Sequence, residues 1–369
     1  MSERFRERVR RLQALMASRD VDLFVIVTLE NYLYFSGDLR KQPRMLIPQQ
    51  GEPALVVFAN EEQEVRRTSW VPRIITYHAL HEMMLSIISE VNRLGKEKPR
   101  IGLEVGFAVP SFLVDRFKVS NPTAEVVQER TFIEKVRKTK DKDEVEAVRK
   151  ASELADKGME LVASLLKPGI RERDVAIELE YQLKRWGADG LGFAPFLNSG
   201  YRSLWLHGMA TSKKIEKGEI VVVDFAPAFR GYHANISRTF LLGKASADQK
   251  EAMNTYLALQ QRAFDALRPG RRLFEIEQEI EDLARQLPRG EHFVRGFVHG
   301  IGLAFEEFPF PTIFPEDIME PLETSMTLSV GHPVLSVPRL GGFKQEDTIL
   351  LTSEGVEVLT QYPGGLIEV

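Results

Sequence analysis

The sequence of 369 residues contains no cysteine. Disulfide bonds, thiolate metal sites and cysteine nucleophiles are therefore excluded, and a metal ion would need carboxylate, imidazole, amide or backbone ligands. Long hydrophobic runs are also missing, since apolar segments such as residues 23–27 are far shorter than the roughly 20 residues that cross a bilayer. The first residues carry charges and no apolar core, so we expect no secretory signal and a cytoplasmic protein.

A large excess of charge of either sign is absent as well. The net charge is −4 at pH 7, which offers no general attraction for nucleic acid or for an anionic membrane surface. With 43% hydrophobic and 28% charged residues, the composition is typical of a globular protein and not of a disordered one. No GxGxxG or GxxxxGK[ST] motif follows a strand expected in the first half, so nothing there indicates nucleotide binding.

The length favours two domains over one, because domains usually contain about 100–200 residues. In the first third, Phe5, Val9, Leu12 and Met16 share one face of an expected helix. Strands are expected at residues 21–27, 54–58, 73–77 and 100–105, with a helix around 83–91. Alternating strands and helices predict an α/β domain. A charged segment follows at residues 134–144, and we place the domains at 1–127 and 128–369.

In the second domain, the pattern predicts two helices, two strands, a further helical stretch and two more strands. Asp143 is a candidate N-cap, with Glu146 as its capping-box partner, for a helix that continues to Leu166. A second helix covers 175–186 and a helical stretch covers 246–287. Strands are expected at 219–225, 235–242, 326–330 and 347–351. This order predicts an α+β domain with long hairpins.

Two of these hairpins can each present a facing pair of residues. If the first turn is centred at position 229.5, Asp224 lies opposite Asn235 with their Cβ atoms about 5 Å apart. A second turn centred at 338.5 opposes Gly331 and Glu346 in the same way. A carboxylate buried on such a strand is costly without a partner, which favours a chemical role for Asp224 and Glu346 over a structural one.

Two histidines stand in apolar segments next to glycines. His299 precedes Gly300 and Gly302, and His207 precedes Gly208. One such histidine is more often a satisfied core residue than a ligand, although the glycines allow a substrate or another backbone to approach closely. Two of them, in one domain with two facing carboxylates, indicate a site.

These segments resemble the pita-bread family of Xaa-Pro aminopeptidases, prolidases, methionine aminopeptidases and creatinase. The similar segments occur in order at residues 136–140, 199–208, 217–226, 231–240, 299–303 and 344–348. The resemblance covers nearly the whole chain. It implies an α/β N-terminal domain of the creatinase/prolidase type, a pita-bread C-terminal domain and a homodimer.

For the metallopeptidases, the resemblance implies two metal ions held by two Asp, one His and two Glu. The matching positions here are Asp224, Asn235, His299, Gly331 and Glu346, so an amide and a glycine replace two carboxylates. Two divalent ions carry a charge of +4, and the two remaining carboxylates offset only half of it. We therefore predict at most one ion (Mn, Co or Zn), bound by Asp224, His299 and Glu346 with Asn235 or His332 assisting.

Creatinase implies a second chemistry, in which a histidine hydrolyses a C–N bond without metal. His207 matches that position and is our candidate proton shuttle, because an imidazole exchanges protons near neutral pH. Glu306, Glu307 and Glu346 are candidates to orient it or to hold a cationic substrate, and His332 is a further candidate substrate ligand. In the first domain, Arg40, with Lys41 and Arg44, is a candidate clamp for a substrate carboxylate.

The sequence thus predicts a hydrolase of the Xaa-Pro peptidase and creatinase superfamily. Its substrate would be a small amide or a dipeptide, its metal site would be altered, and His207 would move the proton. The alternative is a pita-bread protein that binds peptide or protein without catalysis. Turnover of small amides, or its absence, distinguishes the two.

Overall fold

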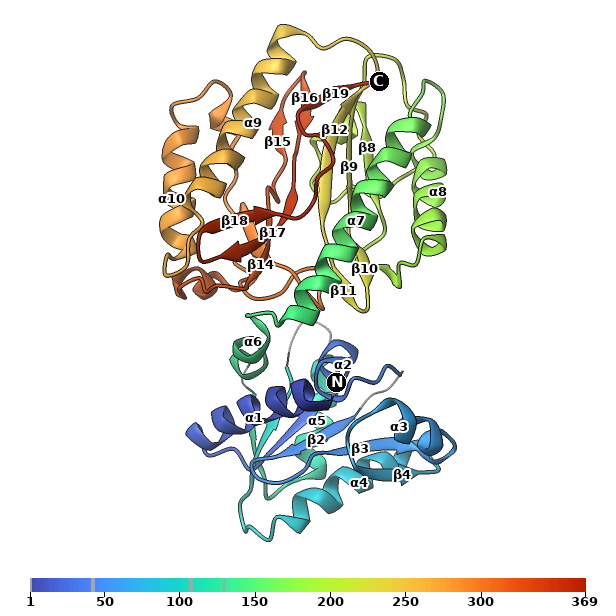
Figure 1. The fold of residues 1–369 in the computed structure, drawn as a ribbon, viewed down its shortest axis with the longest axis vertical. Helices are drawn as coiled ribbons and strands as arrows, with labels where there is room; N and C mark the ends of the chain where they lie inside the picture. Colours follow the sequence, from blue (N-terminus) through green and yellow to red (C-terminus); the bar gives the residue numbers. More distant parts are fainter. Residues whose placement is uncertain (1, 41–43, 106–108, 129) are drawn as a thin grey trace. The chain divides into compact units, whose positions relative to one another are not determined.

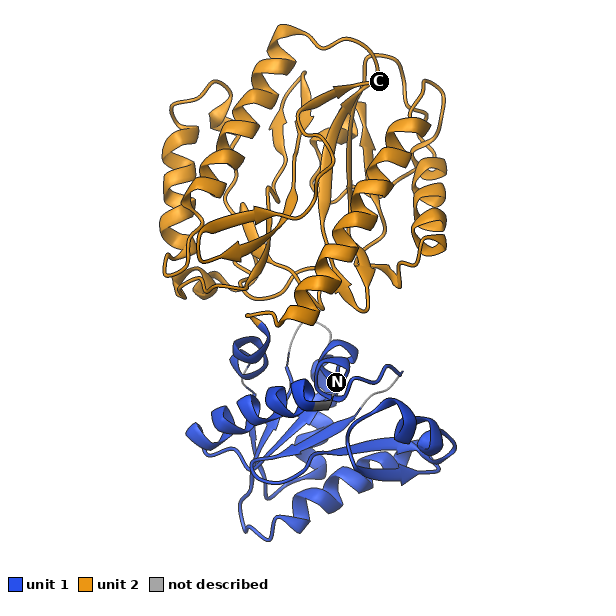
Figure 2. Cartoon of the chain, viewed as in Figure 1, with its two compact units in different colours: residues 1–137 blue, residues 138–369 orange. Residues whose placement is uncertain are grey.

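The computed structural model describes residues 2–40, 44–105, 109–128 and 130–369, and Lys41 lies outside these ranges. The chain forms two compact units, Met1–Arg137 and Lys138–Val369 (Figure 2). The first unit thus ends at residue 137, ten residues after the predicted end of the first domain at residue 127. The reason is α6 (Thr131–Arg137), which packs with α1 (Ser2–Ser18) and places the Phe132 ring 5.6 Å from that of Phe24 in the first unit.

The first unit is built around a six-stranded mixed sheet (Figure 1). Its order is β4-β3-β2-β1-β5-β6, in which β1 pairs with β5, β3 with β4 and β5 with β6 in parallel. The strands are β1 (Leu23–Ile26), β2 (Met45–Pro48), β3 (Ala54–Phe58), β4 (Arg73–Tyr77), β5 (Arg100–Leu103) and β6 (Glu125–Val127). The other helices are α2 (Leu29–Ser36), η1 (Ala59–Glu61), α3 (Glu62–Thr68), α4 (Leu80–Arg93) and α5 (Ser111–Ser120). The predicted α/β domain is confirmed.

The helical face predicted at the start of the chain is the buried face of α1. Phe5, Val9, Leu12 and Met16 are all buried. The segment after β1 forms α2, which begins at the N-cap Thr28 and ends at Gly37, whose φ of 72° is left-handed. Apolar spacing therefore predicted the first helix, whereas the second depends on its caps.

In the second unit, two pairs of helices lie outside two four-stranded sheets (Figure 1). One sheet has the order β19-β12-β9-β8, with β8 (Phe196–Ser199), β9 (Ile220–Phe225), β12 (Ile236–Leu241) and β19 (Leu366–Glu368). The other has the order β13-β14-β17-β18, with β13 (Val298–Gly300), β14 (Thr327–Val330), β17 (Asp347–Thr352) and β18 (Gly355–Val358). Smaller sheets contain β7 (Gly190–Leu191), β10 (Pro227–Phe229) and β11 (Tyr232–His233), and β15 (Leu335–Val337) with β16 (Gly341–Phe343). The predicted α+β arrangement is confirmed.

Each helix pair buries its apolar side against one sheet. The helices α7 (Lys142–Leu165) and α8 (Glu172–Arg185) share a core with β8, β9 and β12. The helices α9 (Ala247–Ala266) and α10 (Leu273–Ala284) share another with β14 and β17. Short helices η2 (Gly200–Leu204), η3 (Gly290–His292) and η4 (Pro315–Met319) lie in the connections. The N-cap of α7 is Asp141 with Glu144 as its capping-box partner, so the prediction of Asp143 and Glu146 was two residues late.

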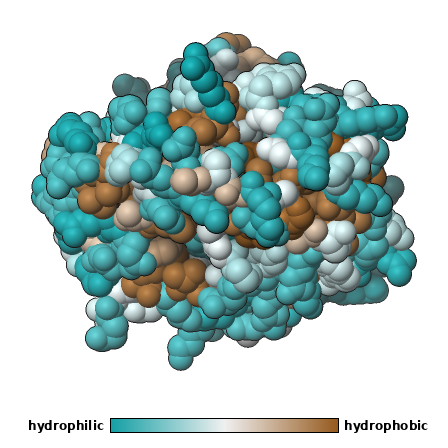
Figure 3. Space-filling model, turned by 90° about the horizontal axis from the view of Figure 1, so that it is seen from above, coloured by the Kyte–Doolittle hydropathy of each residue, from teal (hydrophilic) through white to brown (hydrophobic). Residues whose placement is uncertain are grey.

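Within the described residues, no helix is long and apolar enough to cross a membrane. The face shown in Figure 3 is mostly hydrophilic, with hydrophobic side chains gathered in several separate patches. Scattered patches of this kind are ordinary on a folded protein and do not by themselves indicate a binding surface.

Candidate active site

His207 is exposed on the loop that joins β8 to β9. Glu172, at the first turn of α8 and fully buried, holds both ends of this loop. One carboxylate oxygen accepts from the backbone nitrogen and the hydroxyl of Ser199, each at 2.9 Å. The other accepts from the backbone nitrogen of Thr211 at 3.0 Å and from its hydroxyl at 2.7 Å. A buried carboxylate with four such bonds positions the loop.

Arg202 ties the same loop together from within. Its guanidinium forms a buried ion pair with Glu172 at 3.1 Å and donates to the side-chain oxygen of Asn198 at 3.3 Å. It also donates to the backbone oxygen of Met209 and stacks 4.5 Å from the ring centre of Trp205. The loop is therefore anchored on both sides of His207, whose ring stays at the surface.

The register of the first hairpin differs from the predicted one. Asp224 on β9 pairs with Ser237 on β12, and not with Asn235. The two-residue turn is Arg230-Gly231, with φ of 51° and 79°, which moves the centre from 229.5 to 230.5. Turns of this type normally carry asparagine, aspartate or glycine, so an arginine in that position gave no signal in the sequence.

The second hairpin keeps the predicted register where Val330 on β14 pairs with Asp347 on β17, which is centred at 338.5. Nearer the turn the register changes, since Val337 on β15 pairs with Gly341 on β16, and Glu346 forms a bridge with Ser237. Gly331 has a φ of +115°, and a Cβ added there would lie 2.0 Å from the backbone oxygen of Gln345. The backbone therefore excludes any side chain at position 331.

The centre of the site is a buried ion cluster that the sequence reasoning missed. The ammonium of Lys344 forms ion pairs with Asp224 and, at 2.9 Å, with Glu346 Oε2. The side chains of Lys344, Asp224 and Glu346 are 2%, 6% and 0% exposed. One signal could have indicated it: Lys344 and Glu346 are two residues apart beside β12, and residues at that spacing in an extended chain share a face.

Burial and charge act against each other in this cluster. Burial raises the pKa of Asp224 to about 6, although Lys344 acts to lower it. Burial also acts to raise the pKa of Glu346, but Lys344, His299 and His332 outweigh it and hold the pKa well below its usual range. For Lys344, burial acts to lower the pKa, and the two carboxylates outweigh it and raise the pKa above its usual value. Lys344 is therefore a fixed cation at neutral pH.

His299, on β13, lies against the same carboxylate. Its Nδ1 is 2.9 Å from the backbone oxygen of Gly300 and must donate, because a carbonyl oxygen only accepts. Its Nε2 is 3.3 Å from Glu346 Oε1, which also accepts from the hydroxyl of Ser329 at 2.8 Å. Burial acts to lower the pKa of His299, but Glu346 outweighs it and raises the pKa. A Cβ at Gly300 would lie 2.2 Å from the oxygen of Phe308, so this glycine allows the close backbone approach we expected.

His332 connects this buried cluster to the surface. Its Nδ1 is 3.7 Å from Glu346 Oε1 and 3.8 Å from Glu306 Oε1. Its ring centre is 5.1 Å from that of His299 and 6.1 Å from that of His207. Burial lowers the pKa of His332 below its usual value, so the ring is neutral at neutral pH. His207, His332, Glu306, His299 and Glu346 thus form one continuous group.

Two other candidates have partners of their own. Glu307 accepts from the ammonium of the buried Lys140 at 2.7 Å, so its carboxylate is neutralised by an ion pair. Arg40, in the first unit, pairs with Asp38 at 2.5 Å and with Glu61 at 3.0 Å. Both charges thus have ion-pair partners within their own unit, and the roles predicted for Glu307 and Arg40 stay predictions.

Two divalent ions do not fit this set of donors. Asp224 and Glu346, the two carboxylates expected to bind metal, already share the Lys344 ammonium, and an ion between them would be repelled by it. Asp224 and Asn235 each keep one buried side-chain oxygen, Oδ1, without a hydrogen-bond partner among the described residues. One charged and one amide oxygen next to an ammonium do not replace four carboxylates. The ion pair with Lys344 also disfavours Asp224 as a ligand of a single metal ion.

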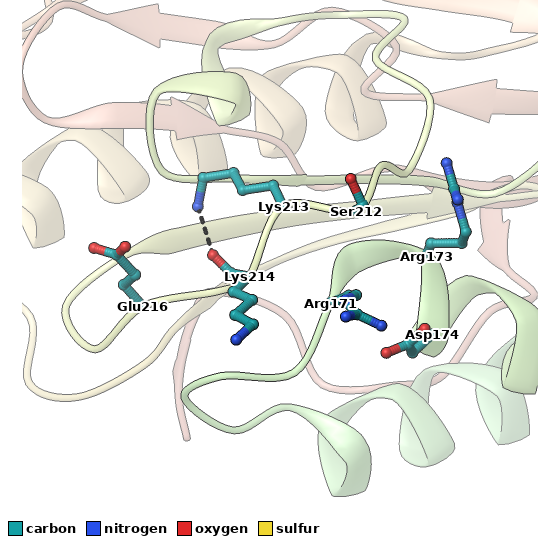
Figure 4. A pocket seen from close by; sticks show the side chains of 7 residues that line it. All are labelled: Arg171, Arg173, Asp174, Ser212, Lys213, Lys214 and Glu216. Atoms are coloured by element: carbon teal, nitrogen blue, oxygen red, sulfur yellow. Dashed lines mark hydrogen bonds between the residues drawn. The ribbon is translucent and has the colours of Figure 1, made fainter.

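A separate hollow of about 620 Å³ lies between the start of α8 and the segment before β9 (Figure 4). Arg171, Arg173, Asp174, Ser212, Lys213, Lys214 and Glu216 line it. The Lys213 ammonium donates to the backbone oxygen of Lys214 at 3.1 Å, drawn in Figure 4, and pairs with Glu219 at 2.6 Å. Most of the lining side chains are exposed, and none of them is a candidate catalytic group. We therefore keep His207 and the buried cluster as the candidate active site.

Comparison with known proteins agrees with this fold. The model of metallopeptidase family M24 matches residues 146–353, and that of the creatinase/prolidase N-terminal domain matches residues 8–139. The Xaa-Pro dipeptidase of Pyrococcus furiosus is 29% identical over 356 residues, which are 96% of this chain and 98% of that protein.

Solved structures give the same result. The prolidase of Pyrococcus horikoshii OT3 is 27% identical with a TM-score of 0.88, covering 98% of this chain and 100% of that one. The Xaa-Pro dipeptidase of Bacillus anthracis is also 27% identical, with a TM-score of 0.89 and coverage of 99% and 100%. The expected creatinase/prolidase-type N-terminal domain and pita-bread C-terminal domain are thereby confirmed.

Proposed function

The chain belongs to metallopeptidase family M24, and we propose that it hydrolyses an amide or related C–N bond of a dipeptide or similarly small molecule, with His207 as proton shuttle. One observation carries the proposal. An exposed imidazole, on a loop anchored by Glu172, stands 6.1 Å from His332 and so beside an ordered group of buried charges. A titratable group next to a fixed polar pocket is the arrangement that general acid–base catalysis needs.

In this proposal His207 acts twice. As a base, its neutral ring takes a proton from a water molecule while the water oxygen bonds to the substrate carbonyl carbon. As an acid, it returns that proton to the leaving nitrogen as the C–N bond breaks. Water and the amide give a carboxylic acid and an amine, so atoms and charge balance. No step is assigned to two metal ions, because the donors do not fit them.

The other residues bind and orient the substrate. Glu306 faces His332 at the open side of the site and suits the cationic end of a dipeptide or another small cation. His332, neutral because burial lowers its pKa, can donate or accept one hydrogen bond. The buried Glu346 and Lys344 keep these groups in place. Xaa-Pro dipeptides are the first substrates to assay, since similar proteins carry that name.

The test is turnover of a panel of Xaa-Pro dipeptides, creatine and related small amides. We expect hydrolysis of at least one compound by the wild type, and His207→Ala should reduce kcat by about 10²–10⁴-fold. His81→Ala is the matched control, because His81 is an exposed histidine on α4 of the first unit. If wild type and His207→Ala are equally inert on the whole panel, the protein does not work as proposed, and binding of peptide or protein without catalysis is the better conclusion.

We also propose that the chain forms a homodimer, as its resemblance to the pita-bread family implies. Light scattering after size exclusion should give twice the 42.0 kDa of one chain. A mass of one chain across the working concentration range would contradict this assembly.

A further inference from the structure

Four potential metal ligands converge beside Lys344. His299, Glu306 and His332 each offer one ligand atom, and these atoms all lie within 4.8 Å of one another. Glu346 Oε1 adds a fourth, 3.3 Å from His299 Nε2 and 3.7 Å from His332 Nδ1. In a tetrahedral site with bonds of about 2.0–2.1 Å, neighbouring ligand atoms are about 3.3–3.4 Å apart. Glu346 Oε1 and His299 Nε2 already have this separation, whereas Glu306 and His332, with ligand atoms 3.8 Å apart, would have to move closer to bind the same ion.

We propose that His299, Glu306, His332 and Glu346 bind one divalent transition-metal ion, and that the Lys344 ammonium takes the place of a second ion. This site is shifted away from Asp224 and Asn235, the ligands expected from the sequence. It uses Glu306 and His332, so when the ion is bound these two side chains hold it and do not contact the substrate directly.

The tautomer of His299 suits this role. Its Nδ1–H donates to the backbone oxygen of Gly300, which leaves the lone pair of a neutral ring on Nε2. Nε2 lies 3.3 Å from Glu346 Oε1, so the imidazole and the carboxylate are placed to bind the same ion. Histidine ligands in proteins usually donate their other nitrogen in this way, which holds the ring in its ligating orientation.

The charges of the cluster balance with one ion and not with two. Three carboxylates, Asp224, Glu306 and Glu346, contribute −3, and the Lys344 ammonium contributes +1. One divalent ion brings the sum to zero, whereas two would leave +2 in a largely buried place. Because uncompensated buried charge is costly, the cluster favours a single ion.

The ligand types narrow the choice of metal. Two imidazole nitrogens and two carboxylate oxygens in a tetrahedral arrangement suit Zn²⁺ or Co²⁺. Mg²⁺ and Ca²⁺ prefer six or more oxygen ligands, which this group does not offer. Lys344 keeps the ion away from Asp224 by repulsion, so the ion lies on the side of His332, nearer to His207.

The test uses Co²⁺ as the probe, because its visible absorption reports both binding and coordination geometry. Chelator-treated, dialysed wild type should bind one Co²⁺ per chain with the strong bands of a tetrahedral complex. Glu306→Gln and His332→Ala should each weaken binding at least about 100-fold. Asn235→Ala is the matched control and should bind Co²⁺ like the wild type. His207→Ala should also bind normally, which separates this inference from the proposed catalytic role.

Three results would overturn the inference: no Co²⁺ bound by the wild type, two ions per chain, or a loss in Asn235→Ala that equals the loss in Glu306→Gln. Circular dichroism and the thermal transition show whether each variant is folded. If His332→Ala is not folded, the conservative Glu306→Gln decides, since it keeps the size and hydrogen bonding of the side chain.

Discussion

Replacing Lys344 with methionine is the most direct test of the buried ion cluster. The substitution keeps most of the side-chain volume and removes the ammonium that Asp224 and Glu346 share. Because all three side chains are almost fully buried, the two carboxylates would face each other without a cation. Breaking a buried pair from one side costs about 3–5 kcal/mol. For a unit of this size that free energy lowers Tm by about 6–20 °C.

The measurement is calorimetric unfolding of the full chain at pH 7.5 with chelator, so that no divalent ion replaces the ammonium. Lys150→Met is the control, because Lys150 pairs with Glu153 on the exposed side of α7, and loss of an exposed pair should leave the transition temperature nearly unchanged. Adding Asp224→Asn to Lys344→Met removes one of the two facing charges and should recover about 1–3 kcal/mol. If Lys344→Met unfolds at the same temperature as Lys150→Met, the three charges do not act as a unit and the reasoning is refuted.

Three further predictions concern the supports of the site. Glu172→Gln should leave Arg202 without its buried anion and lower Tm. It should also misplace His207 and so lower kcat by about 10–100-fold. An unchanged kcat on the best substrate of the panel would contradict the positioning role of Glu172. Gly331→Ala should lower the free energy of unfolding in urea by about 2–4 kcal/mol. Gly365 has a similar φ of +94° but open space around it, so Gly365→Ala should lower that free energy by only about 1 kcal/mol. Equal losses in the two variants would refute the steric clash at position 331. Burial raises the pKa of the Glu277 carboxyl, so its contribution to stability is complete below its unfolded pKa and is lost as pH rises through its folded pKa. The Tm should therefore fall more between pH 4.5 and 7 in the wild type than in Glu277→Gln. Parallel curves of Tm against pH for the two proteins would contradict this prediction.

Local patterns predicted most of the fold. The apolar spacing of Phe5, Val9, Leu12 and Met16 and the β-branched run in β9 reflect burial on one face or on both, which is a property of each segment alone. The register of β14 and β17 was also predictable, since Val330 and Asp347 pair as a turn centred at 338.5 requires. The first hairpin was not, because its turn places Arg230 at a positive φ that its residue type does not indicate.

The site was only half predictable for a different reason. His207, His299, Asp224 and Glu346 belong to motifs, and each motif can be found in a short segment. The ion pair between Lys344 and Asp224 joins residues 120 positions apart, and only the pairing of β9, β12 and the segment before β17 brings them together. The sequence showed that two expected carboxylate ligands are absent from the site. It could not show that the Lys344 ammonium lies next to the two carboxylates that remain.

Gly331 and Lys344 are linked through one short segment of backbone. Position 331 contributes no anion to the cluster, and a Cβ there is excluded by the backbone of Gln345, the residue between Lys344 and Glu346. Restoring glutamate at 331 alone would therefore require that segment to move, and the same movement would displace the ammonium from Asp224. Asn235→Asp would instead add a charge without moving the backbone, and it would place a third carboxylate beside Asp224, which already shares the Lys344 ammonium with Glu346. The cluster is thus held in its present state by geometry as well as by charge, and for that reason we expect a second metal ion to remain excluded after either single substitution.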